Sequence, residues 1–191
     1  MTETPEKLRL GIDLDGVVAD FNSGWMERYN RDFGADLHHS QVIRWDGLHK
    51  LTHFPDMDSF WEWARAGSTS IFRDLPVFDG AVETMADLAR EHRIVIISSK
   101  FDWSIPDTLE WMGQHRIPAR EIHFVWDKTV VTCDVYLEDA PHNLAALVSK
   151  HPDALVCRMV RPWNLPMEGT TDVTDWTAFR EAVLAWEQAR E

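Results

Sequence analysis

Two aspartates, Asp13 and Asp15, follow a short apolar stretch near the start of the chain and are followed by Gly16. Side chains two residues apart on an extended chain point the same way, so both carboxylates leave the end of the predicted strand on one side. Gly16 allows the backbone to turn tightly there. Two like charges at this distance repel each other unless a cation lies between them or one takes up a proton. The stretch is therefore typical of a Mg²⁺ site that serves a phosphate group, although Asp and Gly are also ordinary turn residues.

More polar side chains follow later apolar runs, each where a strand is expected to end. Taken singly, each has a plain structural explanation: a strand-end cap, a solvated loop lysine, or acids at a helix N-terminus. Their order along the chain, each after a predicted strand, instead favours one site that combines hydroxyl, ammonium and carboxylate groups. These residues are Ser98, Ser99, Lys128, Glu138 and Asp139.

The rest of the chain alternates between apolar runs and amphipathic segments. Continuous apolar strands separated by amphipathic helices are typical of a parallel sheet covered on both faces, and ligands bind beyond the carboxyl ends of such strands. The sequence therefore predicts an α/β fold, namely a three-layer α/β/α Rossmann-like parallel sheet. After the first strand, strands are expected at 94–97, 122–125, 133–137 and 154–160, and helices at 80–92, 106–115, 141–149 and 175–189.

The segment after Gly16 has a different character. A helix is expected over 17–29 and another from Asp58-Ser59 onward, and no strand-like run occurs before about residue 72. We therefore expect a small, mostly helical cap at 17–75, inserted after the first strand of a core domain made of 1–16 and 76–191. Two explanations of its aromatic residues stay open: a slot where a nucleobase stacks, or packing inside the cap. These residues are Phe21, Trp45, Phe60, Trp61 and Trp63.

The composition of the 191-residue chain limits the classes of protein it can belong to. With 45% hydrophobic residues it is not disordered, and its formal charge of −13 disfavours a nucleic acid polymer as partner. A small phosphate ester remains compatible, because a bound metal can reverse the local field.

No apolar run is long enough to span a membrane, and the start M-T-E-T-P-E-K is not typical of a signal peptide. We interpret Cys133 and Cys157 as buried thiols and expect a cytoplasmic protein, whose oligomeric state the sequence leaves open.

The order Asp-x-Asp, Ser, Lys and then an acidic pair resembles the haloacid dehalogenase-like superfamily of phosphohydrolases. The resemblance covers nearly the whole chain outside the cap. Within that superfamily, D-L-D-G-V-V-A-D-F, I-S-S and D-K-T-V-V-T-C-D-V-Y-L-E-D-A-P are similar to the 5'(3')-deoxyribonucleotidase branch and its bacterial relatives. The resemblance implies a Mg²⁺-dependent phosphomonoester hydrolase that acts on nucleoside monophosphates through an aspartyl-phosphate intermediate.

The same resemblance implies a role for individual residues. Asp13 would attack phosphorus, and Asp15 would protonate the leaving oxygen and then activate water. Mg²⁺ would be held by the Asp13 side chain, the Asp15 carbonyl and an acid of the pair Glu138 and Asp139, of which either could be the direct ligand. The phosphoryl oxygens would be held by Ser98, Ser99 and Lys128, and the substrate pocket would include Phe21 and Trp126.

Some positions depart from the nucleotidase pattern. Glu138 stands where those enzymes usually carry Asp, Lys100 replaces a proline, and Trp126 and Ala140 stand where an arginine is common in the animal enzymes. Because these changes fall near the substrate, they leave open the preferred nucleotide, including deoxy against ribo and 5' against 3'. One alternative is a phosphatase of another small ester, such as a sugar phosphate or a biosynthetic intermediate. Another is a non-catalytic phosphate-binding protein on the same fold.

Overall fold

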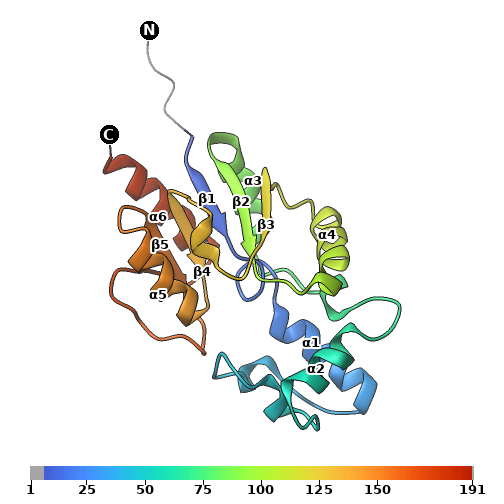
Figure 1. Ribbon diagram of the computed structural model, residues 1–191. Coiled ribbons are helices and arrows are strands. Elements are labelled where there is room, and N and C mark those ends of the chain that lie inside the picture. The colour runs from blue at the N-terminus through green and yellow to red at the C-terminus, as the bar shows by residue number, and fades with distance from the viewer. Residues whose placement is uncertain (1–6, 191) are drawn as a thin grey trace.

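The computed structural model describes residues 7–190, which form a six-stranded parallel sheet in the order β3-β2-β1-β4-β5-β6 (Figure 1). The initial residues 1–6, which include most of the M-T-E-T-P-E-K start, lie outside the described part. The strands are β1 Arg9–Ile12, β2 Arg93–Ser98, β3 Glu121–Phe124, β4 Val135–Glu138, β5 Leu155–Met159 and β6 Thr171–Val173. The helices are α1 Phe21–Phe33, α2 Met57–Arg65, α3 Ala81–Glu91, α4 Ile105–Gln114, α5 Pro141–Lys150 and α6 Trp176–Gln188.

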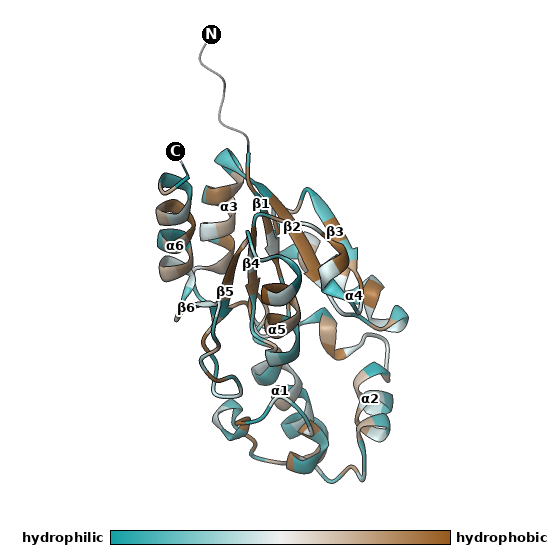
Figure 2. Cartoon of the chain, turned by 60° about the vertical axis from the view of Figure 1, so that its left-hand side comes forward, coloured by the Kyte–Doolittle hydropathy of each residue, from teal (hydrophilic) through white to brown (hydrophobic). Residues whose placement is uncertain are grey.

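Both faces of the sheet are covered, as alternating side chains of β2 show. Ile94 and Ile96 belong to the core cluster that includes α3 and α6, whereas Val95 and Ile97 pack in a second cluster with α5. Figure 2 shows the apolar strands between α3 and α6 on one side and α5 on the other. This arrangement confirms the predicted three-layer α/β/α fold.

The strand order reverses between β1 and β4, and such a switch point is where ligands bind in parallel sheets. The register pairs Ile12 of β1 with Leu137 of β4. The next residue of each strand is therefore Asp13 on one side and Glu138 on the other, which brings the first aspartate beside the later acidic pair.

The helix expected from Val17 begins four residues later, at Phe21, so the predicted start was wrong. The Leu14 carbonyl accepts hydrogen bonds from the backbone N–H groups of residues 17, 18 and 19, which makes a tight turn instead of a helix. Asp20 then caps α1 by accepting from the Ser23 N–H at 3.1 Å. The apolar run at 17–19 is therefore buried by the turn.

Other boundaries also differ from the expectation. Helix α2 is capped by Asp56, two residues before the expected Asp58 start. The short edge strand β6 was missed, because two of its three residues are exposed and the segment has no apolar run. Cys133 precedes β4 instead of lying inside it, but both cysteines are buried free thiols as expected.

The chain leaves the sheet and returns to it at adjacent points. The Phe78 N–H donates to the Val18 carbonyl at 2.9 Å, and the Asp20 N–H donates to the Pro76 carbonyl at 2.8 Å. Between these points, α1 and α2 lie beyond the carboxyl ends of the strands (Figure 1). The division into a cap at 17–75 and a core at 1–16 and 76–191 stays a prediction. Within residues 7–190 we find no helix whose length and apolar character would let it cross a bilayer.

Candidate active site

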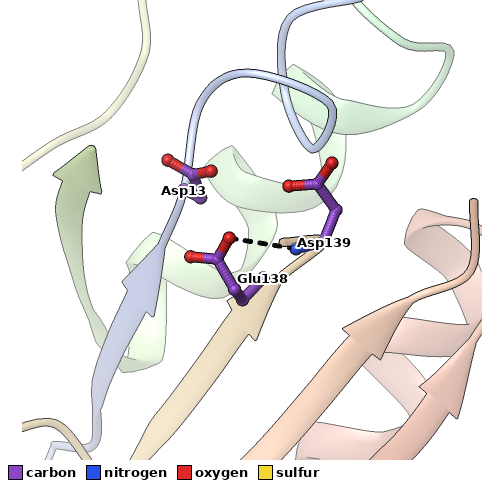
Figure 3. A group of neighbouring side chains, drawn as sticks. All are labelled: Asp13, Glu138 and Asp139. Carbon is purple, nitrogen blue, oxygen red and sulfur yellow. Dashed lines mark hydrogen bonds between the residues drawn. The ribbon is translucent and has the colours of Figure 1, made fainter. Parts of the chain in front are cut away.

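Three buried carboxylates meet at the switch point. Figure 3 shows Asp13 at the end of β1, and Glu138 and Asp139 at the end of β4. One oxygen of each lies within 4.8 Å of the others, so this part of the site is suited to holding an ion. Oxygen donors alone favour a hard cation such as Mg²⁺. The Asp139 Oδ1 atom is buried and has no hydrogen-bond partner among residues 7–190, which leaves it available as a ligand.

The two acids at the end of β4 are held differently. Glu138 accepts from Lys128 at 2.6 Å through Oε2 and from the Ala140 N–H at 3.0 Å through Oε1. Asp139 uses only Oδ2, which accepts from the indole N–H of Trp163 at 2.8 Å. Of the pair that the sequence left open, Asp139 therefore has the freer oxygen for a metal, while Glu138 anchors Lys128.

Burial and mutual repulsion raise the pKa values of these acids. Burial and then the charge of Asp13 raise the pKa of Glu138 to about 7. Burial, followed by the charges of Glu138 and Asp13, raises the pKa of Asp139 well above its usual value. Each acid is therefore stabilised in its charged form only if more positive charge enters the site.

The charges that contact one another in the site do not cancel. When all four carboxylates of the site are ionised they outnumber the two ammonium groups, and a divalent cation would offset the excess of negative charge. The donor set, the free Asp139 oxygen and this charge together fit a Mg²⁺ ion. The four acids are Asp13, Asp15, Glu138 and Asp139, and the two lysines are Lys100 and Lys128.

Gly16 closes the turn beside the acids. Its φ of +79° is one that side-chain-bearing residues rarely adopt, and a Cβ there would overlap the Asp139 carboxylate. The glycine expected to permit a tight turn therefore also makes room for Asp139.

Lys128 lies between the acids of both strands. Its Nζ is 2.8 Å from Asp13 Oδ1 and 2.6 Å from Glu138 Oε2, and 4% of its side chain is exposed. Burial would lower its pKa, but the charges of Asp13 and Glu138 outweigh that effect and raise it. A permanently charged ammonium group thus stands beside the first aspartate.

Asp15 is not one of the three clustered acids and instead pairs with Lys100, whose role the sequence did not reveal. The Lys100 Nζ is 2.6 Å from Asp15 Oδ2 and 3.9 Å from the centroid of the Phe72 ring. Burial raises the pKa of Asp15, although Lys100 opposes that shift. In the sequence, Lys100 is distinguished only as a replacement for proline, because its spacing does not relate it to Asp15, 85 positions earlier in the chain.

We expect Lys100→Met to lower the free energy of unfolding by about 3 kcal/mol at neutral pH, because it leaves a largely buried carboxylate unpaired. In the Asp15→Asn variant, Lys100→Met is expected to lower the free energy of unfolding by at least about 1 kcal/mol less than it does in the wild type, because the lysine then has no charged partner. Urea unfolding of the four proteins of this cycle, in EDTA, measures the coupling. Equal costs in both backgrounds would show that the pair contributes no stability.

The two serines at the end of β2 differ in what they offer. Ser98 is buried and lines the cavity that contains the acids. Ser99 also lines the cavity, but its hydroxyl donates to the Val125 carbonyl at 2.9 Å. The Ser98 hydroxyl is therefore the freer donor for an anionic group.

The cavity has a volume of about 450 Å³ and extends from the acids to the α1–α2 segment. Of the five aromatic residues proposed for a stacking slot, Phe21, Trp45 and Trp61 line it, whereas Phe60 and Trp63 pack inside the segment. Packing therefore explains Phe60 and Trp63, whereas a slot for a nucleobase stays a prediction for Phe21, Trp45 and Trp61.

Other aromatic rings complete this wall of the cavity. Phe21 lies stacked on Phe72, with ring centroids 5.6 Å apart. Trp126, which is 65% exposed, stands at the cavity and contacts Phe101 edge-on at 5.3 Å. The cavity is thus lined by the charged groups at the carboxyl ends of the strands and by aromatic rings from both the sheet loops and the α1–α2 segment. Arg44 and Asp46 of that segment also line it.

The fold is one that solved haloacid dehalogenase-like proteins share. The structure is similar to the crystal structure of a haloacid dehalogenase-like family hydrolase from Xanthomonas campestris, with a TM-score of 0.62 and 13% identity. That match covers 97% of this chain and 99% of the other.

The family follows from the sequence. The model of the family described as 5' nucleotidase, deoxy (pyrimidine), cytosolic type C protein matches residues 7–189, so the chain belongs to this family. A proposed 5'(3')-deoxyribonucleotidase of Chlorobaculum tepidum is 30% identical over 162 residues, which are 76% of each chain. The 5'(3')-deoxyribonucleotidase of Bacillus subtilis is 24% identical over 139 residues, 71% of this chain and 77% of that one. These matches confirm the resemblance to the nucleotidase branch.

Proposed function

We propose that the protein is a Mg²⁺-dependent phosphomonoester hydrolase of the cytoplasm that releases phosphate from nucleoside monophosphates. One observation carries the proposal: in a chain of the nucleotidase family, Asp13, Lys128 and Asp139 line the same cavity as a set of aromatic rings. The charged groups suit a phosphate group, and the aromatic rings suit a planar base.

Asp13 is the nucleophile in this proposal. One of its carboxylate oxygens forms a bond to phosphorus while the bond between phosphorus and the leaving oxygen breaks, which gives an aspartyl-phosphate. Lys128, 2.8 Å from Asp13, and the Ser98 hydroxyl bind the phosphoryl oxygens. Their positions are fixed before the substrate arrives, because both side chains are buried.

Asp15 carries the proton in both halves of the reaction. It gives a proton to the leaving oxygen, which departs as an alcohol. Burial raises the pKa of Asp15 and so helps it to carry that proton, while Lys100 stabilises the carboxylate that the transfer leaves behind. It then takes a proton from the water that attacks phosphorus, and the bond between phosphorus and Asp13 breaks to release phosphate.

The side chains of Asp13 and Asp139 and the Asp15 carbonyl would hold Mg²⁺. When bound, the ion neutralises charge on the phosphoryl oxygens. Glu138 contributes by fixing Lys128, with which it is paired at 2.6 Å.

A panel of phosphate esters tests this function. We expect phosphate release from deoxy- and ribonucleoside 5'- and 3'-monophosphates that stops with EDTA and returns with excess Mg²⁺. Turnover that EDTA leaves unchanged would contradict the metal requirement. The panel also includes sugar phosphates. Fast release from one of them beside slow release from every nucleotide would favour the alternative substrate class, which the exposed Trp126 in place of an arginine motivates.

A further inference from the structure

The loop that follows β5 contacts both halves of the proposed metal site. The Arg161 Nε donates to the Gly16 carbonyl at 2.7 Å, on the turn that follows β1. Trp163 Nε1 donates to Asp139 Oδ2 at 2.8 Å, and Asn164 Nδ2 donates to the Asp139 carbonyl at 2.7 Å. These three residues therefore link the end of β1 to the end of β4 from a third segment of the chain.

The loop is itself held in place. Asn164 is buried, and its Oδ1 accepts from the Arg158 guanidinium at 2.7 Å and from the Arg161 N–H at 3.1 Å. Its Nδ2 also donates to the Met159 carbonyl at 2.9 Å. The indole of Trp163 is thus presented to the acid by a fixed backbone.

The hydrogen bond from Trp163 occupies one oxygen of Asp139 and leaves the other free. Oδ2 accepts the indole N–H, whereas the buried Oδ1 has no partner within residues 7–190. Trp163 also lies close to Gly16, where an added Cβ would be 3.3 Å from the Trp163 ring. A carboxylate fixed through one oxygen has a single orientation for the other, which lowers the cost of ordering it around an ion.

We infer that Trp163 is a positioning residue for the metal: its indole N–H orients Asp139 so that Oδ1 faces the cation. The inference rests on the proposed function in assigning Mg²⁺ to this site. The sequence gives no sign of this role, because a hydrogen bond between residues 24 positions apart leaves no periodic pattern.

Trp163→Phe tests the inference, because it keeps a ring and removes the donor. By calorimetry without substrate, we expect its Kd for Mg²⁺ to rise about 10–100-fold. Trp63→Phe is the matched control, since the Trp63 indole donates to Asp32 at 3.0 Å in the α1–α2 segment, away from the acids. The control is expected to keep the wild-type Kd. A folded Trp163→Phe protein with unchanged Mg²⁺ affinity would overturn the inference.

A second measurement needs no variant. Among the indole N–H resonances of the ten tryptophans, we expect Mg²⁺ to shift one strongly, and K⁺ to leave it in place. The absence of any such shift in the wild-type protein would also overturn the inference. If the wild type binds Mg²⁺ with the expected Trp163 effect but hydrolyses no phosphate ester, the proposed function fails and the inference stands. If it hydrolyses nucleotides with Mg²⁺ and Trp163→Phe binds the ion normally, only the inference fails.

Discussion

Asp13→Asn is expected to lower kcat for every substrate by a factor of about 10⁴ or more, because an amide cannot form the bond to phosphorus. The replacement has nearly the same shape, and the residue is buried at the end of β1 beside Lys128 and Glu138. It also removes one of four carboxylates that repel one another. We therefore expect the variant to unfold at the same or a higher urea concentration than the wild type in EDTA, which separates lost chemistry from lost structure.

The matched control for this replacement is Asp153→Asn, since Asp153 is exposed. It should retain wild-type turnover. Acid quenching during turnover, followed by mass spectrometry of the peptide that contains Asp13, should detect a phosphoryl group in the wild type and none in Asp13→Asn. Turnover at the wild-type rate in Asp13→Asn would show that another group attacks phosphorus.

The strands that carry the site could be predicted because each is an apolar run followed by a polar residue. Ile94 to Ile97 face both core clusters, so their continuous apolar character indicates a strand buried on both sides. A parallel arrangement then brings the carboxyl ends of these strands to one edge of the sheet. That β1 and β4 are neighbours, which places Asp13 next to Glu138, is known only from the structure. Strand β6 could not be predicted from an apolar run, because its residues are mostly exposed.

Contacts between distant loops could not be predicted in this way. Val17 and Val18 satisfied a helical pattern, but the Leu14 carbonyl accepts their N–H groups and makes a turn. Asp20 followed by Ser23 is the local signal that would have placed the helix start correctly. No comparable signal exists for Lys100 or Trp163, because each acts through a side chain from another segment.

Lys128→Met is expected to lower kcat/KM by a factor of about 10²–10³, because the ammonium group is the cation nearest to Asp13 and to the charge that develops on the phosphoryl oxygens. The variant should also be less stable. Asp13 and Glu138 lose a partner at 2.8 and 2.6 Å, and removing one member of a buried ion pair costs about 3–5 kcal/mol.

The size of that stability loss should depend on Mg²⁺, since a divalent cation and the lysine compensate the same acids. We expect the free energy of unfolding of Lys128→Met to be lowest in EDTA and to rise when Mg²⁺ is added. This rise should be larger for the variant than for the wild type. Lys150→Met, a change of an exposed lysine on α5, should behave like the wild type in both conditions. If Mg²⁺ stabilises Lys128→Met and the wild type equally, the lysine and the ion do not share the charge of Asp13 and its neighbours, and the metal must be sought elsewhere.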